Sequence, residues 1–90
     1  ALSTYMKYAA LELAGKGIRC NAVQPGRINT PLISNRLLSE EDVTKDIEQY
    51  PMKRYGKPEE VAHAIIYLLS DASAWVTGTN LVIDGGRSLK

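Results

Sequence analysis

The stretch that decides the fold is residues 18–31, which read IRCNAVQPGRINTP. Residues 18–23 are a short segment that alternates with a period of two, as expected for a β-strand. Pro25 and Gly26 should end this strand, because proline lacks an N–H donor and glycine permits backbone angles that other residues avoid. The stretch therefore predicts a strand that runs into a turn.

A helical pattern precedes this strand, and no proline or glycine interrupts it before Gly15. Its apolar residues recur at helical spacing: Leu2, Met6, Ala9, Ala10 and Leu13. We therefore expect a helix over residues 1–15, closed by Gly15 or Gly17. Because the chain starts with Ala1 inside this pattern, we also expect a truncated or cut chain.

Two further helices are expected after the turn, whereas residues 27–39 show no clear period and predict a loop or a broken helix. Ser39 stands before three acidic residues, a pattern typical of an N-cap and first helical turn. This helix should run to about Tyr50, where Pro51 stops it. The second helix should begin at Pro58, since proline is favoured in the first turn.

A second strand is predicted over residues 79–83, followed by a turn at residues 84–86. Strands separated by helices imply an α/β fold with a parallel sheet that is covered on both faces. Since two strands alone make a poor sheet, we expect the remaining strands to lie upstream of this chain.

Composition narrows the classes of function. The 90 residues suffice for one small domain, and 11 basic against 10 acidic residues give a net charge of +1. This balance provides no general field for nucleic acid or an anionic membrane, so neither is an expected partner. The single cysteine, Cys20, excludes an internal disulfide and a cysteine-based metal site, and it fits a reducing compartment.

The turn after the first strand is the candidate functional site, because α/β sheets bind ligands beyond the carboxyl ends of their strands. Gly26 would let the backbone approach a flat ring, and the Thr30 hydroxyl could donate to or accept from an amide. Each residue also has a structural explanation, since Pro-Gly is a common turn and Thr-Pro often starts a helix. Taken singly, the structural explanation is the stronger one.

The chain as a whole resembles the short-chain dehydrogenase/reductase family, and most closely its 3-oxoacyl reductases and its sugar and small-alcohol dehydrogenases. Five segments carry the resemblance in the family's order: residues 11–17, the strand 18–23, the Pro-Gly-x-x-x-Thr loop 25–30, RYGKPEEVA at 54–62 and TGTNLVIDGG at 77–86. The resemblance implies that residues 1–90 are the C-terminal part of a single NAD(P)-binding Rossmann-type domain, a doubly wound parallel sheet whose N-terminal half is absent.

By this resemblance, the parent protein interconverts a small-molecule carbonyl and alcohol by hydride transfer, with NAD or NADP, as a cytoplasmic homodimer or homotetramer. Pro25 and Gly26 should lie against the nicotinamide ring. The backbone of Ile28 and the hydroxyl of Thr30 should hold its carboxamide. Orienting the ring in this way would lower the entropic part of the barrier.

The family's catalytic Tyr and Lys lie four residues apart on a helix, so that both project from one face. This chain contains no Tyr-x-x-x-Lys, because Tyr50 and Arg54 have the spacing but Pro51 lies between them. In the family's register the Lys would lie just before Ala1, so we expect no catalytic residue here and no activity from the chain alone. The alternative is a non-catalytic dinucleotide-binding relative used for sensing or assembly, which the upstream Tyr and Lys would distinguish.

Other segments give weaker expectations. Residues 31–52, between two prolines, are predicted to form a mobile flap over the substrate. The strand 79–83, the turn after it and Trp75 are predicted to contribute to a subunit interface, unless upstream helices of the same subunit cover them. Arg27 is a candidate contact for an anionic substrate, and His63 has no visible acid or metal partner.

Overall fold

Two short parallel strands form the sheet of the molecule. The computed structural model describes residues 2–29 and 39–90. Strand β1 (Ala22–Pro25) pairs in parallel with β2 (Asn80–Ile83), and the register aligns the first residues of both strands with each other and the last residues likewise. The parallel pair with helices between its strands confirms the predicted α/β class.

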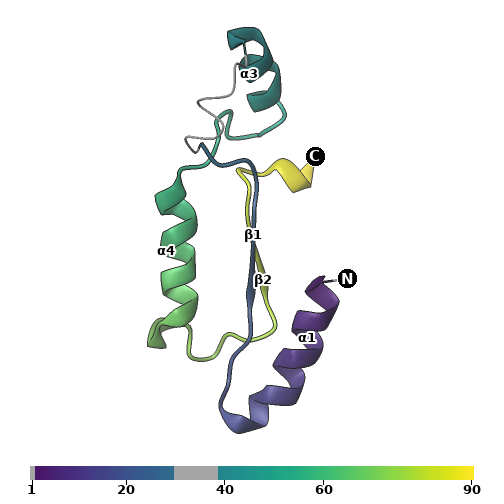
Figure 1. The fold of residues 1–90 in the computed structure, drawn as a ribbon, viewed down its shortest axis with the longest axis vertical. Coiled ribbons are helices and arrows are strands. Elements are labelled where there is room, and N and C mark those ends of the chain that lie inside the picture. The colour runs from purple at the N-terminus through teal and green to yellow at the C-terminus, as the bar shows by residue number, and fades with distance from the viewer. Residues whose placement is uncertain (1, 30–38) are drawn as a thin grey trace.

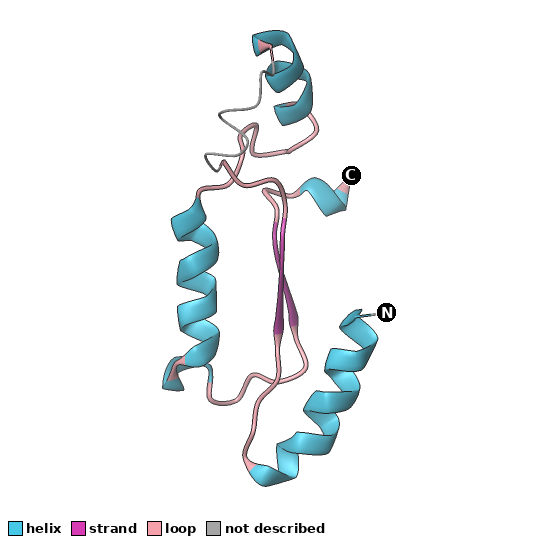
Figure 2. Cartoon of the chain, in the orientation of Figure 1, coloured by secondary structure: helices cyan, strands magenta, loops and turns pink. Residues whose placement is uncertain are grey.

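Helices flank both sides of the strand pair. Figure 1 shows α1 (Leu2–Leu13) on one side and α4 (Pro58–Leu69) on the other, each running opposite to the strands. Helix α3 (Glu40–Ile47) lies beyond the carboxyl ends of the strands, as Figure 2 also shows. The described chain further contains three short 3₁₀ turns, at Ala14–Lys16, Asp71–Ser73 and Arg87–Leu89.

Local signals placed most helix ends as predicted. The Ser39 side chain accepts a hydrogen bond from the Asp42 N–H at 3.1 Å, which confirms the N-cap of α3. Gly17 closes the first helical segment in the left-handed conformation, with φ of 74°. The predicted end of α3 near Tyr50 was wrong, because the Tyr50 N–H bonds to the Ile47 carbonyl and the chain already turns there.

The predicted strand 18–23 was also misplaced, since β1 covers Ala22–Pro25. Upstream of β1, side chains and loop groups replace the strand ladder. The Cys20 N–H donates to Thr77 Oγ1 at 3.1 Å, and Asn21 Oδ1 accepts from the Thr79 N–H at 3.0 Å. At the other end, the Gly26 N–H donates to the Ile83 carbonyl at 2.9 Å, so pairing continues past Pro25.

The apolar core of the described chain is small, consisting of Met6, Ala10 and Tyr50. The molecule measures 51 × 23 × 20 Å, and its radius of gyration of 16.0 Å exceeds the roughly 12 Å of a compact domain of this length. Large apolar side chains are correspondingly exposed, among them Leu2, Leu11, Ile66, Leu69 and Trp75. Such surfaces mark places where other protein packs.

Candidate functional site

The turn that leaves β1 presents peptide groups that no other described residue binds. Ile28 forms an isolated parallel bridge with Gly56, the residue that lies shortly before α4. The bonds of this bridge come from its neighbours, because the Gly56 N–H donates to the Arg27 carbonyl at 3.0 Å and the Asn29 N–H donates to the Gly56 carbonyl at 2.8 Å. Ile28's own N–H and C=O point away from Gly56. They form no hydrogen bond with any other described residue.

Gly26 is required by packing inside the molecule. A Cβ atom at this position would lie 3.0 Å from Asp84 Cβ and 3.2 Å from Tyr50 Cε1, closer than side chains normally approach. Tyr50 is only 8% exposed and lies beneath the turn, where its hydroxyl accepts from the Arg27 N–H at 3.2 Å. Contacts within the chain therefore suffice to explain a glycine here, whether or not a ring packs on it.

Arg27 and Tyr55 both bind one carboxylate oxygen of Asp46, on α3. Arg27 Nη1 lies 2.5 Å from Asp46 Oδ2, and the Tyr55 hydroxyl donates to the same oxygen at 2.6 Å. Burial, together with the bond to Asp46, raises the pKa of Tyr55. Because the charge of Arg27 is already paired, it is a poorer candidate for an anionic substrate than the sequence suggested.

Arg54 and Glu60 form a second ion pair, which the sequence alone did not reveal. The two terminal nitrogens of Arg54, Nη1 and Nη2, donate to the two carboxylate oxygens of Glu60 at 2.7 and 2.8 Å. The Lys57 N–H donates to Glu60 at 2.8 Å, which caps the start of α4. Mainly because of the bond from Arg54, the pKa of Glu60 falls to about 2. A glutamate in the third position of a helix was the available sequence signal.

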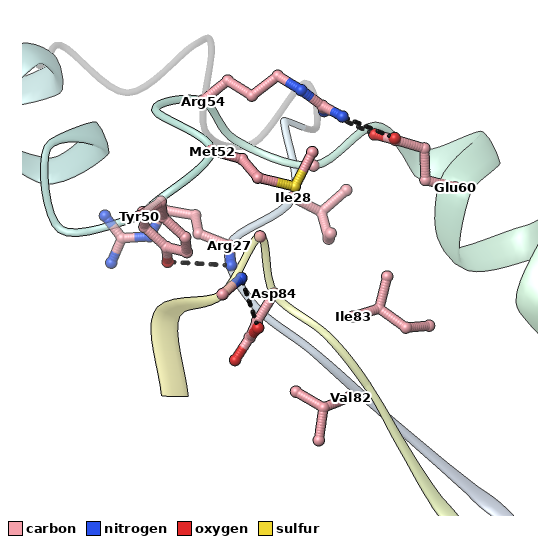
Figure 3. Close-up of a pocket in the computed structure, with 12 residues that line it drawn as sticks. Arg27, Ile28, Tyr50, Met52, Arg54, Glu60, Val82, Ile83 and Asp84 are labelled. Carbon is pink, nitrogen blue, oxygen red and sulfur yellow. Dashed lines mark hydrogen bonds and ion pairs between the residues drawn. The ribbon is translucent and has the colours of Figure 1, made fainter. Parts of the chain in front are cut away.

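A cavity of about 230 Å³ lies beside the turn, at the carboxyl ends of both strands. Figure 3 shows Ile28, Met52 and Val82 contributing apolar side chains to it. Asp84 lies at its edge; burial opposes ionisation there, but hydrogen bonds from Ser88 and from backbone N–H groups hold the pKa of this carboxyl below its ordinary value. The cavity thus combines apolar walls with charges that are already compensated.

The structure brings together three of the four residues predicted from the sequence. Pro25, Gly26 and Ile28 follow one another at the carboxyl end of β1. Thr30 lies outside the described residues, as does part of the predicted flap, residues 31–38. His63 is exposed on α4, and the described residues contain no cluster of acidic, His or Cys side chains suited to a metal ion. Among the described helices, none has the length and apolarity needed to span a membrane.

Comparison with known proteins agrees with this architecture. A family model described as enoyl-(acyl carrier protein) reductase matches residues 1–88. Cyclohexanol dehydrogenase of Acinetobacter sp. (strain SE19) is 46% identical over 84 residues, which cover 93% of this chain and 32% of that protein. The 3-oxoacyl-[acyl-carrier-protein] reductase of Thermotoga maritima is 49% identical over 77 residues, covering 86% of this chain and 30% of that protein.

Solved structures give the same result. A 4-hydroxyisoleucine dehydrogenase mutant complexed with NADH and succinate matches with a TM-score of 0.91 and 31% identity, covering all of this chain and 37% of that one. A 3-oxoacyl-[acyl-carrier protein] reductase from Brucella melitensis matches with a TM-score of 0.86 and 36% identity, covering 94% of this chain and 31% of that one.

The chain belongs to the short-chain dehydrogenase/reductase family, as its resemblance had predicted. Its two parallel strands and flanking helices correspond to part of the Rossmann-type sheet of these enzymes. The chain spans about a third of the length of the curated relatives it matches. These relatives are named as dehydrogenases and reductases, which does not favour the alternative of a non-catalytic sensor.

Proposed function

We propose that this chain is the C-terminal part of a single NAD(P)-binding Rossmann-type domain in a cytoplasmic oxidoreductase. The enzyme would interconvert a carbonyl and an alcohol on a small molecule, with NAD or NADP as the hydride carrier. Membership of the family and the dehydrogenase names of the relatives support this reaction. The NADH bound in one matching structure supports the cofactor.

The observation that carries the proposal is the N–H and C=O of Ile28, which form no hydrogen bond with any other described residue. A nicotinamide carboxamide has an NH₂ donor and a C=O acceptor, and the N–H and C=O of one residue complement both. Pro25 and Gly26 would lie against the ring, and the Thr30 hydroxyl would provide a further bond to the carboxamide. The bound cofactor would supply or accept the hydride, while these residues fix which face of its ring meets the substrate.

Proton transfer needs residues that this chain does not contain, since it has no Tyr-x-x-x-Lys. We propose that the preceding segment of the longer protein provides both, and that residues 1–90 alone are inactive. The small core and exposed apolar surface of the described chain support the second point. Carbonyl reduction by the isolated 90 residues, or cooperative thermal unfolding of them, would contradict it.

The carboxamide contact can be tested in the full-length protein. An acetylpyridine analogue of the cofactor, in which a methyl group replaces the NH₂, should lose the bond to the Ile28 carbonyl. Thr30→Val should lower cofactor-dependent kcat/KM by a factor equivalent to about 0.5–1.5 kcal/mol of transition-state stabilisation, the value of one neutral hydrogen bond. Thr30→Ser keeps the hydroxyl and should not lower it. Unchanged kinetics with both the analogue and Thr30→Val would remove these contacts from the proposal. Absence of any NADH- or NADPH-dependent reduction over a carbonyl panel would remove the reaction.

We further propose a homodimer or homotetramer, with contacts through β2, α4 and the loop between them. Trp75 is 99% exposed, and Ile66, Leu69 and Val82 are also exposed on these elements. Trp75→Asp in the full-length protein should reduce the mass measured by light scattering, with Thr44→Asp on α3, outside these elements, as a control for added charge. A folded Trp75 variant of unchanged mass would contradict this interface.

A further inference from the structure

Within the described residues, helix α3 is bonded to the turn after β1 through one side chain. None of its residues is buried, and its own Lys45–Glu41 ion pair lies within the helix. In the described part of the chain, Asp46 is the residue of α3 whose side chain bonds to other segments. Lys53 and Lys90 also donate to the carbonyl of Glu48, the C-cap residue, but only Asp46 links the side chains of α3 to the turn after β1 in the described chain.

The bonds of Asp46 lead directly to the turn after β1. One partner is Arg27, which lies between Gly26 and Ile28, and the other is Tyr55, which immediately precedes the bridging residue Gly56. Tyr50 contacts the same place from below, because its hydroxyl binds the Arg27 N–H and its ring packs edge-on against Tyr55 at 6.3 Å. Residue 27 is thus bound through both its side chain and its backbone.

The bonds of Asp46 with Arg27 and Tyr55 are weak enough to form and break reversibly. The side chains of Arg27 and Asp46 are 47% and 24% exposed, so water and salt weaken their attraction. The bond from Tyr55 adds to the pair without burying it. Breaking these bonds should free α3 while the paired strands stay intact.

We infer that Asp46 is a positioning residue, which couples the docking of α3 to the conformation of the Gly26–Ile28 turn through Arg27 and Tyr55. The inference rests on the proposed function, since the turn would hold the nicotinamide ring. When α3 is docked, the peptide groups of Ile28 keep the geometry that receives the carboxamide. Cofactor binding must in turn favour the docked helix, because coupling between two sites is reciprocal.

The test uses the full-length protein and compares Asp46→Asn with Glu41→Gln. Both substitutions remove one negative charge and one ion pair from α3, but only the first touches the turn. We expect Asp46→Asn to raise the Kd of NADH or NADPH, followed by nicotinamide fluorescence, and the cofactor KM by about two- to fivefold, as for the loss of a partly exposed charged contact. The kcat at saturating cofactor should change less than the KM. Asp46→Glu should recover part of the affinity, and Glu41→Gln should match the wild type.

Hydrogen exchange provides a second readout. Cofactor should slow exchange across residues 40–47 in the wild type and much less in Asp46→Asn. If Asp46→Asn fails to fold, Tyr55→Phe removes one of the two bonds and should shift Kd in the same direction. Equal Kd values for wild type, Asp46→Asn or Tyr55→Phe, and Glu41→Gln would overturn the coupling while leaving the proposed function intact. A wild-type protein that binds no nicotinamide cofactor would overturn the proposed function itself.

Discussion

The two ends of the strand pair are fastened in different ways. At the amino end, a single guanidinium forms four hydrogen bonds. Arg19 donates to the carbonyls of Leu68, Ser70 and Val76 and to Ser73 Oγ. At the carboxyl end, two ion pairs between side chains, Arg27–Asp46 and Arg54–Glu60, add to the backbone bonds of the turn. Ser73 is fully buried, whereas all four members of these two pairs reach solvent.

This difference suggests that the amino end contributes mainly to stability, whereas the carboxyl end can change its conformation. Arg19 binds two backbone carbonyls at the end of α4, where a cation is also favoured by the helix dipole, and a third in the loop that follows, so its bonds hold backbone segments together. The pairs at the carboxyl end can open one at a time while the backbone stays in place. Ligands of α/β sheets bind at that end, where an adjustable surface is of use.

Arg19→Ala should have the largest effect of the changes considered, because it removes four hydrogen bonds from the region around the fully buried Ser73. We expect the free energy of unfolding of the full-length protein to fall by about 2–4 kcal/mol, measured by urea denaturation. Arg19→Lys should recover less than half, since one ammonium cannot reproduce the fork. A loss below about 0.5 kcal/mol for Arg19→Ala, the range of ordinary surface changes, would make the two ends equivalent.

Gly86→Ala, in the turn at the carboxyl end of the strand pair, should lower the free energy of unfolding by an intermediate amount. Gly86 has φ of 89°, and a Cβ there would lie 2.9 Å from Pro51 Cγ. We expect a loss of about 1–3 kcal/mol from backbone strain and crowding. Gly85→Ala is the matched control, because its φ is 60° and its nearest contact would be an ordinary 3.5 Å, so it should cost about 1 kcal/mol. Equal losses in thermal or urea unfolding would show that the contact with Pro51 is unimportant.

The smallest effect concerns the Arg54–Glu60 pair and acid. The folded pKa of Glu60, about 2, lies below its ordinary value of 4.5. The contribution of this carboxylate to stability is therefore fully present above about pH 4.5 and is lost as the pH falls toward 2. The Tm advantage of wild type over Glu60→Gln should be small near neutrality and should shrink through this range. Glu59→Gln, at a residue without an ion pair in the described chain, should show no such trend.

Local rules account for what the sequence could predict. Ser39, Gly17 and Pro58 mark helix ends through contacts with residues close by in the chain, and the structure confirms them. The limits of β1 could not be predicted in the same way, because they depend on which residues of a distant strand lie opposite.

In the candidate site too, features set by local residue types could be predicted, and contacts between distant residues could not. The Pro25–Gly26 turn was evident from its residue types, whereas the tie between Arg27 and Asp46 joins residues 19 positions apart that no motif connects. Tyr50, whose ring lies against Gly26, bonds to Arg27 across 23 positions, and only the folded structure shows these contacts. Packing between distant segments thus supplied what residue types alone could not.

The parallel pairing of β1 with β2 also constrains the order of folding. The Asn21 side chain receives the Thr79 N–H across 58 positions, and α3 and α4 lie in between. Closing so long a loop costs entropy before any strand bond repays it, and such non-local pairing slows folding. During synthesis β1 leaves the ribosome well before its partner exists. Until Asn80–Ile83 emerges, one edge of β1 stays open to other chains, and a chaperone that covers it would be acting in this interval.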